Sequence, residues 1–240
     1  MTDSITGQVL AVFLRARTAS PGYCRFMSNL GLSADELLST TRAVRKRLDF
    51  DRPVSDDLLR ECVESAIQAP TGSNVQGWHF VLVTEREKIE KIAAIYKKAF
   101  DWYKDSPVYA GRVASGISND RDAQQQRVAN SADYLADNMH RSPALFIPCM
   151  NGRNETAGAA GSIIPAAWSF MLAARERGLG TCWTTLHLMH EREAADVLDI
   201  PFDDVQQWAL SPVAYTKGTD FKPASRPDVE TVISWNSWSG

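Results

Sequence analysis

The alternation of hydrophobic and polar positions predicts a succession of helices and short strands along most of this chain. Ser33 is suited to cap a helix, and Glu36 three residues later completes a capping box. Ser55 repeats this pattern before a helix that Pro70 ends. The apolar side chains between Ser55 and Pro70 recur at helical spacing: Leu58, Leu59, Cys62, Val63, Ala66 and Ile67.

Further helices are predicted over residues 88–103, 121–141, 163–177 and 191–198. Short apolar runs predict buried strands at residues 80–83, 144–149, 181–185, 208–214 and 229–235. Helices and strands alternate irregularly, so we predict an α+β sandwich and not a doubly wound parallel sheet.

Composition fits one domain, since 240 residues with 44% hydrophobic side chains can bury a sizeable core. We expect residues 1–32 to form an N-terminal extension, in which the apolar run 9–14 predicts a helix packed on the body or on a partner subunit. Residues 33–240 are expected to form the domain itself. The 26 basic and 29 acidic residues are interspersed, which argues against a nucleic-acid-binding surface.

The amino-terminal region has no basic segment before its apolar run, and that run is too short to cross a membrane. We therefore expect a cytoplasmic protein with no membrane partner. His187 and His190 lack a third ligand nearby, so no metal site is predicted. The cysteines form no CxxC pair and indicate neither a zinc site nor a disulfide framework: Cys24, Cys62, Cys149 and Cys182. No Walker, GxGxxG or Gly-x-Ser-x-Gly motif is present.

The loop at residues 69–80 reads Ala-Pro-Thr-Gly-Ser-Asn-Val-Gln-Gly-Trp-His-Phe and joins an amphipathic helix to a strand. Gly72 permits unusual backbone angles. Ser73, Asn74 and Gln76 present hydrogen-bonding groups that would suit a planar, amide-rich ligand. The alternative is a capped loop whose side chains bond only the backbone.

Upstream of this loop lies a cluster of arginines at residues 42–47. The first predicted helix is expected to deliver Arg42 and Arg45, which share one face if the segment is helical. Forked guanidinium groups match a phosphate bidentately. A solvated basic helix end is the alternative explanation.

In their order and spacing, the arginine cluster and the loop resemble the FMN-dependent nitroreductase family, whose members carry an Ala-Pro-Ser-x-x-Asn-x-Gln-Pro-Trp-x-Phe-like loop after an Arg-rich segment. Residues 134–148, residues 164–185 and the late Arg226-Pro-Asp-Val segment fit the same pattern. The resemblance covers residues 39–235.

This resemblance implies a three-layer sandwich, with a central, mostly antiparallel sheet flanked by helices. It also implies an FMN flavoprotein that takes hydride from NADH or NADPH and reduces a small nitroaromatic or quinone acceptor by a ping-pong mechanism. The flavin would perform the hydride transfer, so no catalytic side chain is required. A homodimer with FMN between the subunits is implied as well, and the apolar helix predicted at 163–177 agrees with it.

The resemblance assigns the cofactor a set of binding residues: Arg42, Ala43, Arg45, Pro70, Thr71, Ser73, Asn74, Gln76, Ile164, Pro165, Trp183, Thr184, Thr185 and Arg226. Arg45 is the candidate for positive charge near the flavin N1 atom. The chain departs from the family pattern at Ala43, where a serine is common, and at Ala224, where a lysine is common. Lys222 is a candidate substitute for that lysine.

Trp102, Tyr103 and Tyr109 lie between two long helices, in the region that varies most among similar proteins. They are either core aromatics or a lid over the flavin that shapes substrate choice. Two alternative functions stay open: a specialised flavin enzyme on the same scaffold, such as a reductive dehalogenase or a flavin-fragmenting synthase, and a non-enzymatic flavin-binding protein.

Overall fold

The computed structural model describes residues 29–112, 119–153 and 155–238. The helix predicted at residues 9–14 lies outside the described residues. The helices are α1 (Ala34–Thr40), α2 (Asp56–Ala66), α3 (Arg86–Asp105), α4 (Asn119–Asn138), α5 (Ala157–Glu176) and α6 (Glu191–Leu198). The strands are β1 (Leu48–Asp49), β2 (Trp78–Val83), β3 (Ala144–Asn151), β4 (Leu179–Thr181), β5 (Val205–Gln207) and β6 (Ser211–Thr216).

The strands form a single sheet in the order β1-β6-β3-β2, with β4 also paired to β6 and β5 to β3. Each of these strand pairs is antiparallel. β2 lies at the edge, because in the described part of the chain it pairs only with β3. The predicted α+β class with a mostly antiparallel sheet is confirmed.

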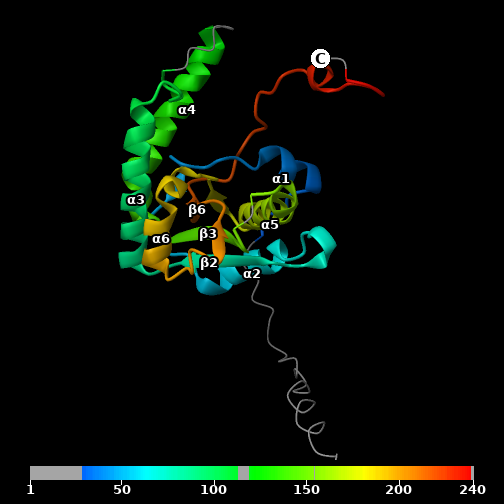
Figure 1. The fold of residues 1–240 in the computed structure, drawn as a ribbon. Helices are drawn as coiled ribbons and strands as arrows, with labels where there is room; N and C mark the ends of the chain where they lie inside the picture. The colour runs from blue at the N-terminus through cyan, green and yellow to red at the C-terminus, as the bar shows by residue number, and fades with distance from the viewer. Residues whose placement is uncertain (1–28, 113–118, 154, 239–240) are drawn as a thin grey trace, which may run out of the picture.

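The central strand β3 divides its side chains between two cores, because successive residues of a strand point to opposite faces. Leu145 and Ile147 pack in a cluster with residues of α3, α4 and α6. Ala144 and Phe146 pack in a second cluster with residues of α2 and α5. Helices therefore cover both faces of the sheet, which gives the three layers that the resemblance implies (Figure 1).

α5 is the apolar helix of the second core, and it begins at Ala157, six residues before the predicted start. Thr156 caps it by accepting a hydrogen bond from the backbone of Ala159 at 3.3 Å. Two glycines in its first turns and Pro165 within it weaken the helical signal of the sequence. By length and composition α5 could cross a membrane, but many of its side chains are buried in this fold.

The predicted strand at 181–185 is misplaced, since β4 ends at Thr181. Gly178, with φ at 74°, ends α5 and leads directly into β4. At Gly180 an added Cβ would lie 2.9 Å from the Val44 Cβ and 2.7 Å from the Thr216 Cγ2. Glycine at this position therefore allows the chain around Val44 to pack closely on β4.

The strand predicted at residues 208–214 is not continuous, because residues before β6 form backbone hydrogen bonds with two different segments. The backbone of Trp208 still donates to Pro148 on β3, at 2.9 Å, whereas Leu210 exchanges backbone hydrogen bonds with Thr184. The chain then joins the sheet again as β6, which pairs with β1, β3 and β4.

The prediction of a strand at residues 229–235 is wrong, because the structure has no strand there. Val229–Val232 form a 3₁₀ turn, and the Asp228 side chain accepts the backbone hydrogen bond of Glu230 at 3.1 Å. The β-branched residues of this segment are exposed, with 74% of Val232 accessible to solvent. A strand needs a neighbouring strand for its backbone hydrogen bonds, and no described strand lies beside this segment.

His187 is a fully buried histidine, and neither of its ring nitrogens has a hydrogen-bond partner in the described structure. Burial lowers the pKa of His187 from 6.5 to about 4. The unfolded chain therefore takes up a proton below pH 6.5, while the folded chain resists protonation until about pH 4.

We expect this histidine to cost the fold about 3 kcal/mol of unfolding free energy as the pH falls from 6.5 to 4. Urea unfolding at several pH values would measure this. A His187→Phe variant should lose less stability than the wild type over that range, whereas His140→Gln, at an exposed site, should follow the wild type. Equal acid sensitivity in His187→Phe and the wild type would contradict the assignment.

Candidate functional site

The segment between α1 and β1 carries the arginines predicted to bind a phosphate. α1 ends at Thr40, whose hydroxyl donates to the carbonyl one turn earlier at 2.6 Å, and the next residue is extended. Val44 then donates to the Thr181 carbonyl at 2.8 Å, so the segment runs along β4. Arg42 lies on extended chain, whereas Arg45 stands at the bend that opens the turn before β1. The segment is not helical, so the expectation that the first helix delivers both arginines is wrong.

Arg42 and Arg45 have different neighbours. The Arg42 Nη1 donates to the Lys222 carbonyl at 2.9 Å. Burial raises the pKa of the Cys182 thiol, and the Arg45 guanidinium beside it opposes that rise. Within residues 29–112, 119–153 and 155–238, neither arginine forms an ion pair with a carboxylate. Their charge is available for an anionic ligand.

The loop after α2 has unusual backbone geometry. Three non-glycine residues lie in the left-handed region, with φ at 52° for Ser73, 54° for Asn74 and 51° for Gln76. Each such residue costs on the order of 1 kcal/mol relative to ordinary backbone angles. Strain of this kind in an exposed loop is typical of binding and catalytic sites.

The polar side chains of this loop bond to one another as well as to the backbone. The Thr71 hydroxyl accepts a hydrogen bond from the Gln76 backbone at 3.2 Å, as expected if the loop's side chains cap its own backbone. The Gln76 amide nitrogen donates to the Asn74 side-chain oxygen at 3.1 Å. Both amides are exposed, and the remaining Asn74 nitrogen and Gln76 oxygen make no hydrogen bond in the described structure. They can pair with a planar ligand.

Ser162 joins this loop to the first half of α5. Its hydroxyl accepts from the Gly72 backbone at 3.2 Å and donates to the Gly158 carbonyl at 3.0 Å. Ile164 and Pro165 follow within one turn of α5, and Ile164 is 44% exposed. The structure thus brings the predicted loop residues, Pro70 to Gln76, next to the predicted residues of α5.

The predicted residues after β4 lie beside the arginine segment. Ala43 forms a parallel bridge with Thr181, two residues before the Trp183–Thr185 triplet begins. Thr184 is fixed by its hydroxyl, which donates to the Leu210 carbonyl at 2.7 Å, while Thr185 is exposed. No hydrogen bond in the described chain links this group to the 70–77 loop, so the predicted residues fall into two neighbourhoods.

Arg226 stands apart from both neighbourhoods. It is exposed, and its hydrogen bond goes to the carbonyl of Ser225 at 3.4 Å. It follows Lys222 by four residues, and Lys222 is the residue whose carbonyl Arg42 holds. Arg226 therefore lies four residues along the chain from the residue that Arg42 contacts, and no described hydrogen bond links its side chain to Arg42.

The three predicted lid aromatics have separate environments. Tyr103 and Tyr109 pack edge to face, with ring centroids 5.4 Å apart, and the Tyr109 hydroxyl donates to Asp133 on α4 at 2.8 Å. Burial raises the pKa of Tyr109 to about 12. These two tyrosines tie α3 to α4, whereas Trp102 is 62% exposed. Trp102 is the one of the three that is free to contact a ligand or a partner.

Arg175 and Phe221, which the sequence did not single out as site residues, form a cluster with Arg47. Arg175 is a buried cation at the end of apolar α5, and burial lowers its pKa. Its Nη2 donates to the Thr219 carbonyl at 2.9 Å. The signal that could have found it is the first charged residue after a long apolar helical stretch. Arg47 pairs with Asp220, whose pKa is lowered mainly by that hydrogen bond.

These observations test whether the chain fits a flavin phosphate. Arg42, Arg45 and Arg175 carry no ion pair with a described carboxylate, and the exposed loop offers amide groups and strained backbone. Cationic forks and amides are the donors that a phosphate and a planar heterocycle require. Among the described residues, no group of three or more His, Cys, Asp or Glu side chains could hold a metal ion.

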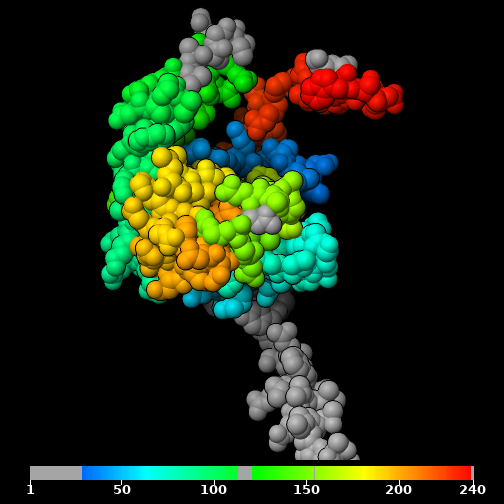
Figure 2. Space-filling view, in the orientation of Figure 1, coloured from blue at the N-terminus to red at the C-terminus, as the bar shows by residue number. Residues whose placement is uncertain are grey.

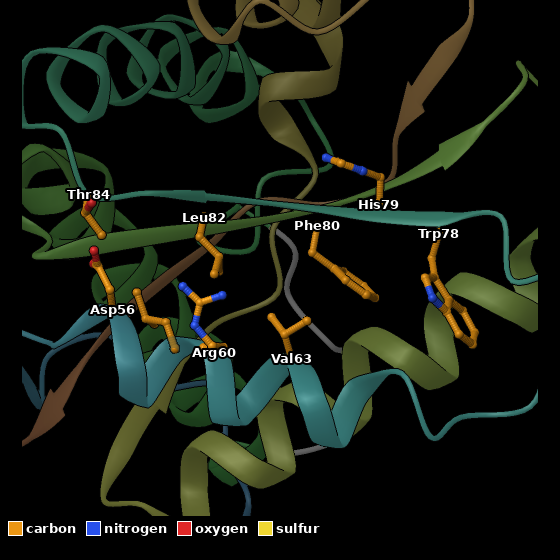
Figure 3. Close-up of a pocket in the computed structure, with 9 residues that line it drawn as sticks. Asp56, Arg60, Val63, Trp78, His79, Phe80, Leu82 and Thr84 are labelled. Atoms are coloured by element: carbon orange, nitrogen blue, oxygen red, sulfur yellow. The ribbon is translucent and has the colours of Figure 1, made fainter. Parts of the chain in front are cut away.

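A hollow of about 420 Å³ lies away from these predicted residues, between α2 and the edge strand β2 (Figure 3). Arg60 and Val63 rise into it from α2, and the rings of Trp78 and Phe80 descend from β2. A second hollow of about 490 Å³ lies along β2 and includes Ile200 and Pro201. None of the residues predicted to bind the cofactor lines either hollow.

Comparison with known proteins agrees with this fold. The model of the nitroreductase family matches residues 38–215. A curated NADH dehydrogenase/NAD(P)H nitroreductase of Methanothermobacter thermautotrophicus is 33% identical over 73 residues, which are 30% of this chain and 37% of that protein. The matches cover about a third of the length of such curated relatives.

Two solved structures share the fold at low sequence identity. The FMN- and NADPH-dependent nitroreductase NfnB of Sphigopyxis sp. strain HMH aligns with a TM-score of 0.65 and 21% identity, over 86% of this chain and 100% of NfnB. An iodotyrosine deiodinase bound to FMN and 3-iodo-L-tyrosine also aligns with a TM-score of 0.65, at 19% identity, over 85% of this chain and 99% of that chain.

Proposed function

Because this chain belongs to the nitroreductase family, we propose that it is an FMN-dependent oxidoreductase that uses NADH or NADPH to reduce a small nitroaromatic or quinone acceptor. The observation that carries this proposal is the set of half-buried and buried arginines without carboxylate partners. The strained, amide-bearing loop of the other neighbourhood supports it. FMN, when bound, would supply the hydride transfer.

The chain's own residues would bind and orient the cofactor. We assign Arg42 to the phosphate, together with Arg226 and Lys222 on the C-terminal segment. Asn74 and Gln76 would hydrogen bond the polar edge of the ring, and Ile164 with Pro165 would form an apolar wall beside it. Thr184, Thr185, Trp183 and the backbone at Ala43 would close the opposite side.

Arg45 would hold positive charge near the ring. Its neighbours Cys182 and Tyr96 are buried, and burial raises the pKa of both, so they stay neutral and leave the Arg45 charge unopposed. A cation held in this way favours a ligand that gains negative charge on reduction. No side chain is required as a nucleophile.

Steady-state kinetics test the proposed reaction. If donor and acceptor use the same exposed face in turn, varying NADH or NADPH at several concentrations of a nitroaromatic or quinone should give the parallel double-reciprocal lines of a ping-pong mechanism. Turnover that requires both substrates at once would give intersecting lines and contradict the mechanism.

We also propose a cytoplasmic homodimer. Exposed apolar side chains support the dimer. Ile164 and Trp168 are neighbours on α5. Trp235 and Trp238 lie on a C-terminal segment that stands away from the body (Figure 2). The edge of β2, with its two hollows, offers a surface for such a segment from a second copy. Sedimentation should give twice the 26.6 kDa of one chain, and a monomer at working concentration would contradict the dimer.

A dehalogenase is the second candidate function, because the deiodinase aligns as well as NfnB does. Reduction of iodotyrosine faster than of nitroaromatics would favour it. A protein that binds FMN and leaves it oxidised with both NADH and NADPH would instead be a flavin-binding protein.

A further inference from the structure

Three arginines hold the loop at residues 217–222, which follows β6 and leads into the C-terminal segment. Arg47 Nε donates to the Lys217 carbonyl at 2.9 Å, Arg175 to the Thr219 carbonyl at 2.9 Å, and Arg42 to the Lys222 carbonyl at 2.9 Å. We call this loop with its three arginines the arginine frame. It ties the root of the C-terminal segment to two parts of the chain distant in sequence, the connection between α1 and β1 and the end of α5.

Phe221 occupies the centre of the arginine frame. Its ring centroid lies 4.2 Å from the Arg47 Cζ and 4.9 Å from the Arg175 Cζ. An aromatic face attracts guanidinium groups, and here one ring serves two of them. Gly218 suits this loop, because its φ of 77° favours glycine and an added Cβ there would lie 2.7 Å from the Arg47 Nη2.

The arginine frame concentrates more positive charge than the fold neutralises. Arg42, Arg47, Arg175 and Lys222 meet around this loop, and among the described residues only Asp220 forms an ion pair with any of them. Arg175 is buried with its Nε and Nη1 unpartnered in the described structure. Like charges held this closely repel, so the arrangement favours binding of an anion.

We propose that Phe221 and Arg175 are positioning residues for the phosphate of the cofactor, an inference that rests on the proposed FMN function. They fix the 217–222 loop, and the Lys222 carbonyl of that loop orients Arg42 through Nη1. The remaining donors of Arg42 and the Lys222 ammonium group would then hold the phosphate. Phe221 and Arg175 would act through this loop and Arg42, without touching the flavin ring.

Comparing FMN with riboflavin isolates this role, because riboflavin carries the same ring without the phosphate. Dissociation constants would be measured by fluorescence for the wild type, Phe221→Leu and Arg175→Met. We expect FMN to bind about tenfold more weakly to both variants, while riboflavin affinity stays within about twofold. Phe221→Tyr, which keeps the ring, should restore FMN affinity.

Arg177→Met is the matched control, since Arg177 lies two residues from Arg175 but pairs with Glu61 at 3.0 Å. It should change neither constant. Thermal unfolding would confirm that each variant is folded. If Arg175→Met does not fold, the comparison of FMN with riboflavin is made with Phe221→Leu alone. Unchanged FMN affinity in folded variants, or equal weakening of both ligands, would overturn the positioning role. A wild type that binds neither flavin would overturn the proposed function itself.

Discussion

Replacing Arg42 with alanine is expected to weaken FMN binding by about 1.5 to 3 kcal/mol, roughly tenfold to a hundredfold, which is the usual range for hydrogen bonds to a charged group. Arg42 has no carboxylate partner in the described chain, and one of its donors is already committed to the Lys222 carbonyl. Its other donors are free for a phosphate. Arg226→Ala should act in the same direction.

Titration of FMN into each variant would measure this effect. Arg192→Ala is a suitable control, because Arg192 on α6 pairs with Asp203 at 3.3 Å and has no assigned contact with the cofactor. Its FMN affinity should match the wild type. Unchanged affinity in both Arg42→Ala and Arg226→Ala would remove the phosphate assignment.

Replacing Phe170 with alanine is expected to lower the free energy of unfolding by about 3 to 5 kcal/mol. Phe170 is completely buried in α5, and its ring stacks on Phe146 of β3 with centroids 3.8 Å apart and planes at 2°. Truncation would leave a cavity between helix and sheet that rigid neighbours on both sides cannot fill.

Urea unfolding at a fixed flavin concentration would measure this loss. Trp168→Ala on the same helix should lower the free energy of unfolding by less than half as much when the protein is measured as a monomer, since 40% of that side chain is exposed. A loss below about 1 kcal/mol for Phe170→Ala would show that the stacked pair does not organise this core.

Local sequence patterns predict α2 and α6 closely. Both are amphipathic, and Ser55 accepts the backbone hydrogen bond of Leu58 at 3.3 Å as its cap position predicts. The observed bounds of α6, Glu191–Leu198, are those predicted. In these helices the residues that set the start and the end lie within or next to the helix itself, so a short stretch of sequence is enough to predict the bounds.

Strand positions depend on partners that lie far away in sequence. Thr181–Thr185 is rich in β-branched and aromatic residues, yet the partner β6 extends along it only as far as Thr181. The segment at 229–235 has strand-like composition as well, but no described strand is beside it. Composition shows that a segment suits a strand, and only the fold shows whether a partner is present.

The candidate site divides in the same way. Asn74, Gln76 and Arg42 lie in compact motifs, and the sequence predicts them as binding residues. Arg175 and Phe221 carry no site prediction, since one is the first of three charged residues at the end of an apolar helix and the other a single ring in a polar segment. They meet because Thr216 pairs with Gly178, which places the end of β6 against the end of α5.

We expect this chain to bind FMN, and NADH or NADPH to reduce the bound flavin. An absorbance spectrum of the purified protein, taken before and after anaerobic addition of NADH or NADPH, tests this expectation most directly when the released chromophore is also identified by mass. We expect the bands of oxidised flavin, an FMN mass, and loss of the bands on addition of the donor. A colourless protein that also fails to take up added FMN would contradict the account.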